Sequence, residues 1–77
     1  MQERDIRLLF DAGAVTKASA VYTQIHNGYI LAFQAKNNKE LIYLEAQWGG
    51  QRIAKTLDAA AESIKRIGFK SFTVDYI

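Results

Sequence analysis

The side chains that could catalyse a reaction are few in this sequence, and their spacing does not suit catalysis. His26 is the only imidazole, and no serine has a plausible histidine and acid partner; the serines are Ser19, Ser63 and Ser71. Nucleophilic catalysis needs a nucleophile or base that a third group holds in place. The sequence therefore predicts a protein that is not an enzyme, with no catalytic residue and no cofactor.

Metal ligands are equally scarce. Cysteine is absent, which removes thiolate metal sites and disulfides. His26 cannot build a zinc or haem site with carboxylates alone, and no glycine-rich phosphate loop or paired-histidine zinc motif occurs. We therefore expect no bound metal.

Basic side chains gather in the C-terminal half of the chain, where they could bind the phosphates of DNA. This set is Arg52, Lys55, Lys65, Arg66 and Lys70. Several of the same residues would also stabilise the negative end of a helix, which is a purely structural role. Both interpretations stay open, although a formal charge of +2 is a weak basic bias for a DNA-binding protein.

Trp48 lies in the segment QWGGQR, beside two glycines. A tryptophan in such a loop could fill a pocket of a partner or stack on a base. It could equally close one end of the hydrophobic core.

The pattern of apolar residues and turn signals predicts one α+β domain over residues 1–77. Its order is α-β-β-β-β-α-β, with two helices and a mostly antiparallel sheet of four to five strands. The helices are expected at 3–12 and 57–67, and the strands at 17–26, 29–36, 39–47, 51–55 and 70–77.

Two-residue turns fix the expected pairing of the strands. Asn27-Gly28 is a strong hairpin signal and places Tyr22 opposite Phe33. Asn37-Asn38 places Phe33 opposite Ile42.

Both faces of the resulting sheet are apolar. The core face holds Tyr22, Tyr29, Leu31, Phe33, Ile42, Leu44 and Ala46. The second sheet face holds Val21, Thr23, Ile25, Ile30, Ala32, Leu41 and Tyr43. A solvated face should be mainly polar, so something is expected to cover it.

Three covers are compatible with the sequence: the N-terminal helix, a second copy of the chain, or a nucleic acid or other ligand. A chain of 77 residues has a thin stability margin and no disulfide, so self-association is the favoured choice. We expect a dimer or higher homo-oligomer that uses Val21, Ile25, Ile30, Leu41 and Tyr43.

The expected cellular location is inferred from the lack of membrane-spanning and export signals in the sequence. No apolar run approaches eighteen residues, and the start MQERDIRLLF has no signal-peptide core. We expect a cytoplasmic protein that does not bind membranes.

The segments QRIAKTLDAAAESIKRIGFKSFTVDY and RDIRLLFDAG resemble small partition-associated (ParC-like) accessory proteins of plasmids and mobile elements. The resemblance implies a bacterial, cytosolic protein and assigns no functional residue. The TLDAA helix is also similar to the one that backs the sheet in the DNA-binding domains of phage-type integrases. Those domains read DNA with polar and basic sheet residues, whereas the second sheet face here is aliphatic.

The first functional hypothesis is therefore a small, self-associating accessory or interaction protein of a bacterial mobile element. The alternative is a weak DNA-binding or DNA-architecture module that uses the C-terminal basic residues.

Overall fold

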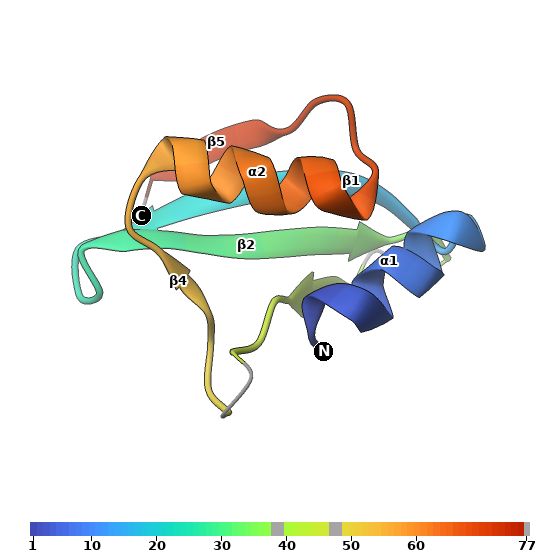
Figure 1. Cartoon of the computed structure of the whole chain (residues 1–77), viewed down its shortest axis with the longest axis horizontal. Coiled ribbons are helices and arrows are strands. Elements are labelled where there is room, and N and C mark those ends of the chain that lie inside the picture. The colour runs from blue at the N-terminus through green and yellow to red at the C-terminus, as the bar shows by residue number, and fades with distance from the viewer. Residues whose placement is uncertain (38–39, 47–48, 77) are drawn as a thin grey trace.

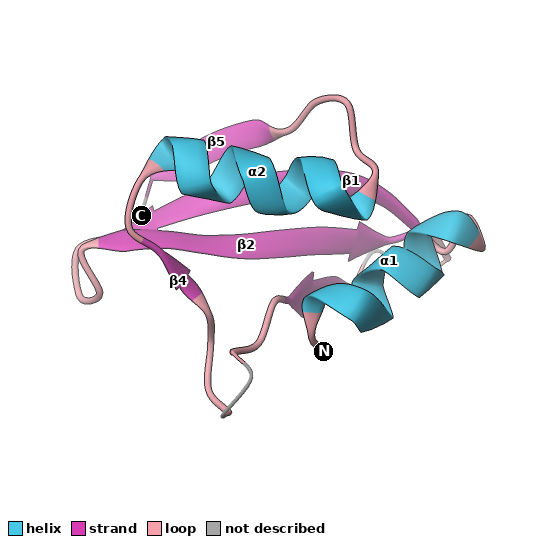
Figure 2. Cartoon of the chain, in the orientation of Figure 1, coloured by secondary structure: helices cyan, strands magenta, loops and turns pink. Residues whose placement is uncertain are grey.

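The computed structural model describes residues 1–37, 40–46 and 49–76 of the chain. It contains two helices and a five-stranded, mostly antiparallel sheet, which confirms the predicted α+β class and element order (Figures 1 and 2). The elements are α1 (Glu3–Asp11), β1 (Val15–Thr23), β2 (Gly28–Ala35), β3 (Leu41–Tyr43), β4 (Ile53–Ala54), α2 (Leu57–Ile67) and β5 (Thr73–Tyr76).

Both helices end at glycines, as their sequences predict. At the end of α1, the amide of Ala14 donates to the carbonyl of Leu9, and Gly13 has a φ of +74°. This is the Schellman arrangement, in which a left-handed residue closes the helix. Helix α2 begins at Thr56, whose side chain accepts a hydrogen bond from the amide of Ala59 at 3.1 Å, and it ends at Gly68.

The strands are ordered β3-β2-β1-β5, and β4 pairs with β2 beside β3. Strand β5 runs parallel to β1, and every other pairing is antiparallel. Strand β2 therefore lies in the middle of the sheet, with β1 on one side and both short strands on the other.

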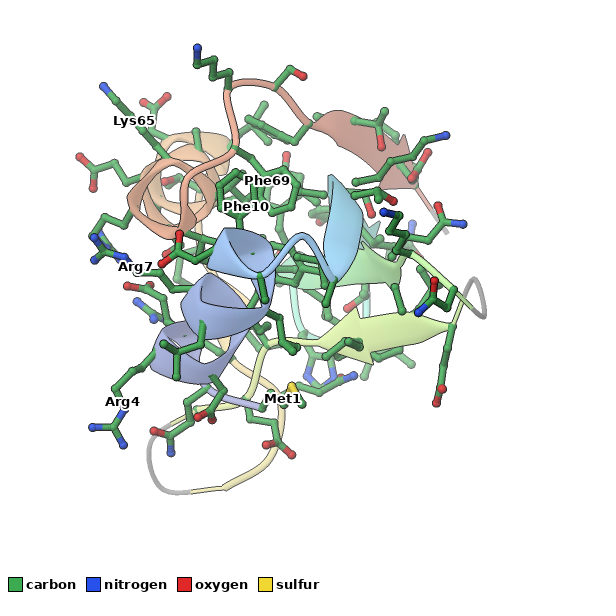
Figure 3. All side chains as sticks on the ribbon, turned by 90° about the vertical axis from the view of Figure 1, so that its right-hand side faces the viewer. Met1, Arg4, Arg7, Phe10, Lys65 and Phe69 are labelled. Atoms are coloured by element: carbon green, nitrogen blue, oxygen red, sulfur yellow. The ribbon has the colours of Figure 1, made fainter. Side chains whose placement is uncertain are left out.

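Both helices cover the same face of the sheet (Figures 1 and 3). Ile6 of α1 and Ile64 and Ile67 of α2 are buried in one core with Leu31 and Phe33 of β2. The rings of Phe10 and Phe69 meet at the edge of this core, with centroids 4.6 Å apart (Figure 3). The interpretation in which the N-terminal helix covers the second sheet face is therefore wrong, because Ile6 belongs to the core on the opposite face.

The predicted register of the first hairpin is also wrong. Tyr22 pairs with Tyr29 rather than with Phe33, because residues 24–27 form a longer connection than a two-residue turn. In this connection the amide of Asn27 donates to the carbonyl of Gln24 at 3.2 Å. The register moves by an even number of residues, so each strand residue keeps its predicted face.

The second predicted register is confirmed. Phe33 pairs with Ile42, and the amide of Leu44 donates to the carbonyl of Leu31 at 3.0 Å. Residues 39 and 47, the ends of the strand predicted over 39–47, lie outside the described residues. Between them β3 covers only Leu41–Tyr43, because the chain leaves the sheet at Glu45 and returns at Gln51, which form an isolated bridge. This excursion, residues 45–52, separates β3 from β4 along one edge of β2.

Among the described residues, neither helix combines the length and apolar character needed to cross a bilayer.

Candidate interaction surface

The second sheet face consists of cross-strand rows of side chains, because paired residues in a sheet point to the same side. Three rows cross it completely, each starting at β5 or β1 and ending at β3 or β4. They are Asp75–Val21–Ile30–Ile53, Thr73–Ser19–Ala32–Tyr43 and Lys17–Gln34–Leu41. Each row begins with a polar residue and ends with an apolar one. The face is therefore graded from polar at β5 to apolar at β3 and β4.

The apolar half of this face is open to solvent. No helix lies over it, and Leu41 and Tyr43 keep 50% and 41% of their surface exposed. Ile30 and Ala32 are buried, at 8% and 1% exposure, because they lie on the central strand between flanking side chains. The open apolar surface is therefore a band along β3, continued by the half-buried Ile53 of β4.

Ile25 lies beyond the end of β1 rather than within a strand, although it lines a hollow with Thr23 and Ile30 of the second sheet face. The residue lies in the β1–β2 connection and is 92% exposed, because β1 ends at Thr23. The other four predicted residues, Val21, Ile30, Leu41 and Tyr43, do share one face. Sequence reasoning missed Ile53, which joins them through its pairing with Ile30.

A groove of about 550 Å³ lies on the polar half of the second sheet face, between β1 and the chain that leads into β5, and extends to Ala32 of β2 and Leu41 of β3. Its lining includes Lys17, Ser19, Lys70, Thr73 and Asp75. The two lysines and the aspartate give the groove both signs of charge, so it is not selective for a single ion type. The sequence predicted a mainly apolar face edged by Gln34 and Glu45, and the polar side chains of β1 and β5 make this half of the face more polar than predicted.

The five predicted DNA-binding residues are distributed over several parts of the molecule. Arg66 donates two hydrogen bonds to the Glu3 carboxylate, both at 3.1 Å, and Arg52 reaches the same carboxylate at 3.4 Å. Lys70 lines the groove on the polar half of the second sheet face, while Lys55 precedes α2 and Lys65 lies in its last turn. Two of the five charges are thus partly neutralised by one carboxylate.

The Glu3 cluster ties three separate segments together. Glu3 lies in the first turn of α1, Arg66 in the last turn of α2, and Arg52 at the end of the excursion. Hydrogen bonding by Arg66 lowers the pKa of Glu3, and the Glu3 carboxylate in turn raises the pKa of Arg66. Glu3 keeps 27% of its side chain exposed, so solvent screening limits the strength of the cluster.

The remaining candidate residues that the structure describes lie apart from the Glu3 cluster or contact it from one side. His26 is exposed in the β1–β2 connection, and the hydroxyl of Ser63 accepts a hydrogen bond from Arg66 at 3.1 Å. Trp48 lies outside the described residues. Within the described part of the chain, no three histidine, cysteine or acidic side chains are placed to hold a metal ion.

Fold and surface together define a small α+β protein whose helices cover one sheet face and leave the other open. The chain matches no protein-family model, no curated protein and no solved structure. The residues and their geometry are thus the basis for any assignment of function.

Proposed function

We propose that this chain is a non-enzymatic interaction protein that associates with copies of itself through the apolar half of the second sheet face. The observation that carries the proposal is the exposure of Leu41 and Tyr43 beside the buried Ala32, with no helix or strand over them in the part of the chain that the structure describes. Covering a leucine or tyrosine completely contributes about 1.5–3 kcal/mol, and roughly half of that surface is still exposed here.

The symmetry available to identical chains fits the same proposal. Both partners being identical, a two-fold arrangement would place the apolar band of one copy against that of the other.

The proposed cellular location and genetic origin of the protein have weaker support than its self-association. The resemblance of residues 4–13 and 51–76 to partition-associated proteins is our only reason to propose a cytoplasmic accessory protein of a plasmid or mobile element. The alternative of a DNA-binding module stays a prediction. The pairing of Arg52 and Arg66 with Glu3 does not favour it.

Sedimentation velocity over a range of concentrations tests the self-association. We expect a dimer or larger species, and we expect Tyr43→Glu to weaken it at least tenfold by placing a charge in the apolar band. Leu8→Glu is the matched control, since Leu8 is 64% exposed on α1, on the helical side of the molecule. A folded protein that stays monomeric, or that dissociates with Leu8→Glu and not with Tyr43→Glu, would overturn the proposal.

A further inference from the structure

The two edges of the sheet differ in whether another strand could add to them. One edge is formed by β3 and β4, which have three and two residues and are separated by the excursion. The other edge is β5, an uninterrupted strand that pairs with β1 on one side only among the described residues. Short and interrupted strands resist edge-to-edge pairing, whereas a regular edge strand presents free backbone groups.

Strand β5 carries one charged residue, Asp75, and otherwise none of the residues that normally protect an edge. Thr73–Tyr76 contains no lysine, proline or glycine, and three of its four residues favour strands. Its last residue, Tyr76, keeps 72% of its surface exposed. The edge is therefore chemically suited to accept another strand.

We propose that β5 pairs antiparallel with β5 of a second copy, across a two-fold axis, so that the two sheets become one. Because the two strands are identical, a two-fold axis makes each the partner of the other and closes the assembly at this edge. This interface differs from the apolar half of the second sheet face. It does not rest on the proposed function.

The positions of Val74 and Asp75 select the register. Val74 pairs with the buried Ala20 and shares the core side of the sheet, while Thr73 and Asp75 point to the second sheet face. The registers that keep these sides matched between the copies place a residue of β5 opposite itself. Placing Thr73 or Tyr76 opposite itself pairs only that residue of β5 with β5 of the second copy, whereas the other two registers each pair three residues of the strand. One places Asp75 opposite Asp75 of the second copy, which is unfavourable because like charges face each other.

The other register places Val74 opposite Val74 of the second copy and Thr73 opposite Asp75 of the second copy. The threonine hydroxyl can then donate to the carboxylate. The same register brings Tyr76 opposite Phe72 of the second copy, which covers part of the exposed tyrosine ring. Cross-strand aromatic pairs of this kind stabilise sheets, so this is the register we assign.

Disulfide trapping tests the register directly, because the chain contains no cysteine. Residues opposite each other in a sheet have Cβ atoms about 4.5–5.5 Å apart, close to the distance that a disulfide spans. Val74→Cys should therefore form a covalent dimer under mild oxidation. Thr73→Cys and Asp75→Cys, made singly, are the controls and should form much less. A dimer trapped mainly by Thr73→Cys or by Asp75→Cys, or by none of the three, overturns the proposal.

A charge exchange tests the same pairing without a covalent bond. Thr73→Asp would face Asp75 of the second copy at two symmetric positions, and we expect it to weaken association roughly fivefold or more. Adding Asp75→Lys to this variant turns both contacts into ion pairs and should restore association. Thr73 and Asp75 are both exposed, so neither change disturbs the core. Unchanged association of Thr73→Asp would contradict the assignment.

The variants described above distinguish the two proposed interfaces from each other. Loss of association with Tyr43→Glu alone would support the sheet face and overturn the β5 pairing. Loss with Thr73→Asp alone, and its recovery in the double variant, would support the β5 pairing and remove the support for the sheet face. A protein that is monomeric in every variant overturns both.

Discussion

Gly28 and Ile53 lie so close together that a methyl group on the glycine would be 2.6 Å from Cγ2 of Ile53. The carbonyl oxygen of Ala54 would lie 2.8 Å from the same methyl group. Strand β4 can approach β2 at this point because Gly28 has no side chain. Position 28 therefore requires a glycine because the two strands approach each other closely there. A positive φ is not the reason, since the backbone of Gly28 does not adopt one.

Gly28→Ala should destabilise the protein by roughly 1–3 kcal/mol, because the new methyl group overlaps atoms that cannot easily move. Urea denaturation measures the change. Ile53→Ala should recover only part of the loss, because the backbone oxygen of Ala54 remains in place. Full recovery in the double variant would show that the side chain of Ile53 alone, and not the backbone oxygen of Ala54, opposes the new methyl group.

Leu41 and Leu44 make a matched pair on the two sides of the same chain segment. Leu44 is fully buried in the core and Leu41 is 50% exposed on the second sheet face. Leu44→Ala should cost about 2–5 kcal/mol of the free energy of unfolding at any protein concentration. Leu41→Ala should cost little at low concentration and more at high concentration, if a second copy covers it. A concentration-independent cost for Leu41→Ala would argue against that cover.

The Glu3–Arg66 contact should give a pH-dependent coupling energy. Arg66 lowers the pKa of Glu3 below its ordinary value of 4.5 in the folded protein. Its stabilising effect is therefore complete above this ordinary pKa and disappears as the pH falls through the lowered one. A double-mutant cycle with Glu3→Gln and Arg66→Gln should give roughly 0.5–1 kcal/mol at pH 7, as expected for a partly exposed pair.

Lys65→Gln is the control for this cycle, because Lys65 is the neighbouring cation in the same helical turn and forms no ion pair with Glu3 among the described residues. Coupling between Lys65 and Glu3 should be close to zero. Coupling between Glu3 and Arg66 that persists unchanged at pH 2 would contradict an ionic origin.

Gly68→Ala should destabilise more than Gly13→Ala, although both glycines end helices. At Gly13 a methyl group would meet nothing within 4 Å, so only the positive φ of +74° opposes it. At Gly68 the φ is +131°, and the methyl group would lie 2.5 Å from the ring of Phe10. We expect roughly 1 kcal/mol for Gly13→Ala and 2–4 kcal/mol for Gly68→Ala, measured by thermal denaturation. Equal losses would show that the Phe10 ring moves aside freely.

Local patterns were sufficient to predict the helices, the order of the elements and the side of the sheet to which each strand residue points. Helix α2 runs from Leu57 to Ile67, as its cap and terminal glycine indicate. The face assignment survived an error in the first hairpin because the register moved by an even number of residues. Sheet faces depend only on alternation, so they tolerate such an error.

Interactions between distant segments could not be predicted from these patterns. The Asn27-Gly28 signal was interpreted as a tight turn, whereas Gly28 serves the approach of β4, which lies about 25 residues further along the chain. The position of α1 beside α2 and the convergence of Arg52 and Arg66 on Glu3 likewise depend on tertiary packing. For this reason the sequence alone could not show that two of the five candidate DNA-binding residues, Arg52 and Arg66, pair with the Glu3 carboxylate.

The excursion between β3 and β4 leaves the sheet and returns to the same edge of β2. Its ends are held by the Glu45–Gln51 bridge and by a hydrogen bond from the amide of Ala46 to the carbonyl of Gly50. A methyl group at Gly49 or Gly50 would meet no atom within 4 Å. A foreign peptide or a fluorescent label inserted between these two glycines would therefore enter open space at this point, and the Glu45–Gln51 bridge lies outside the inserted segment.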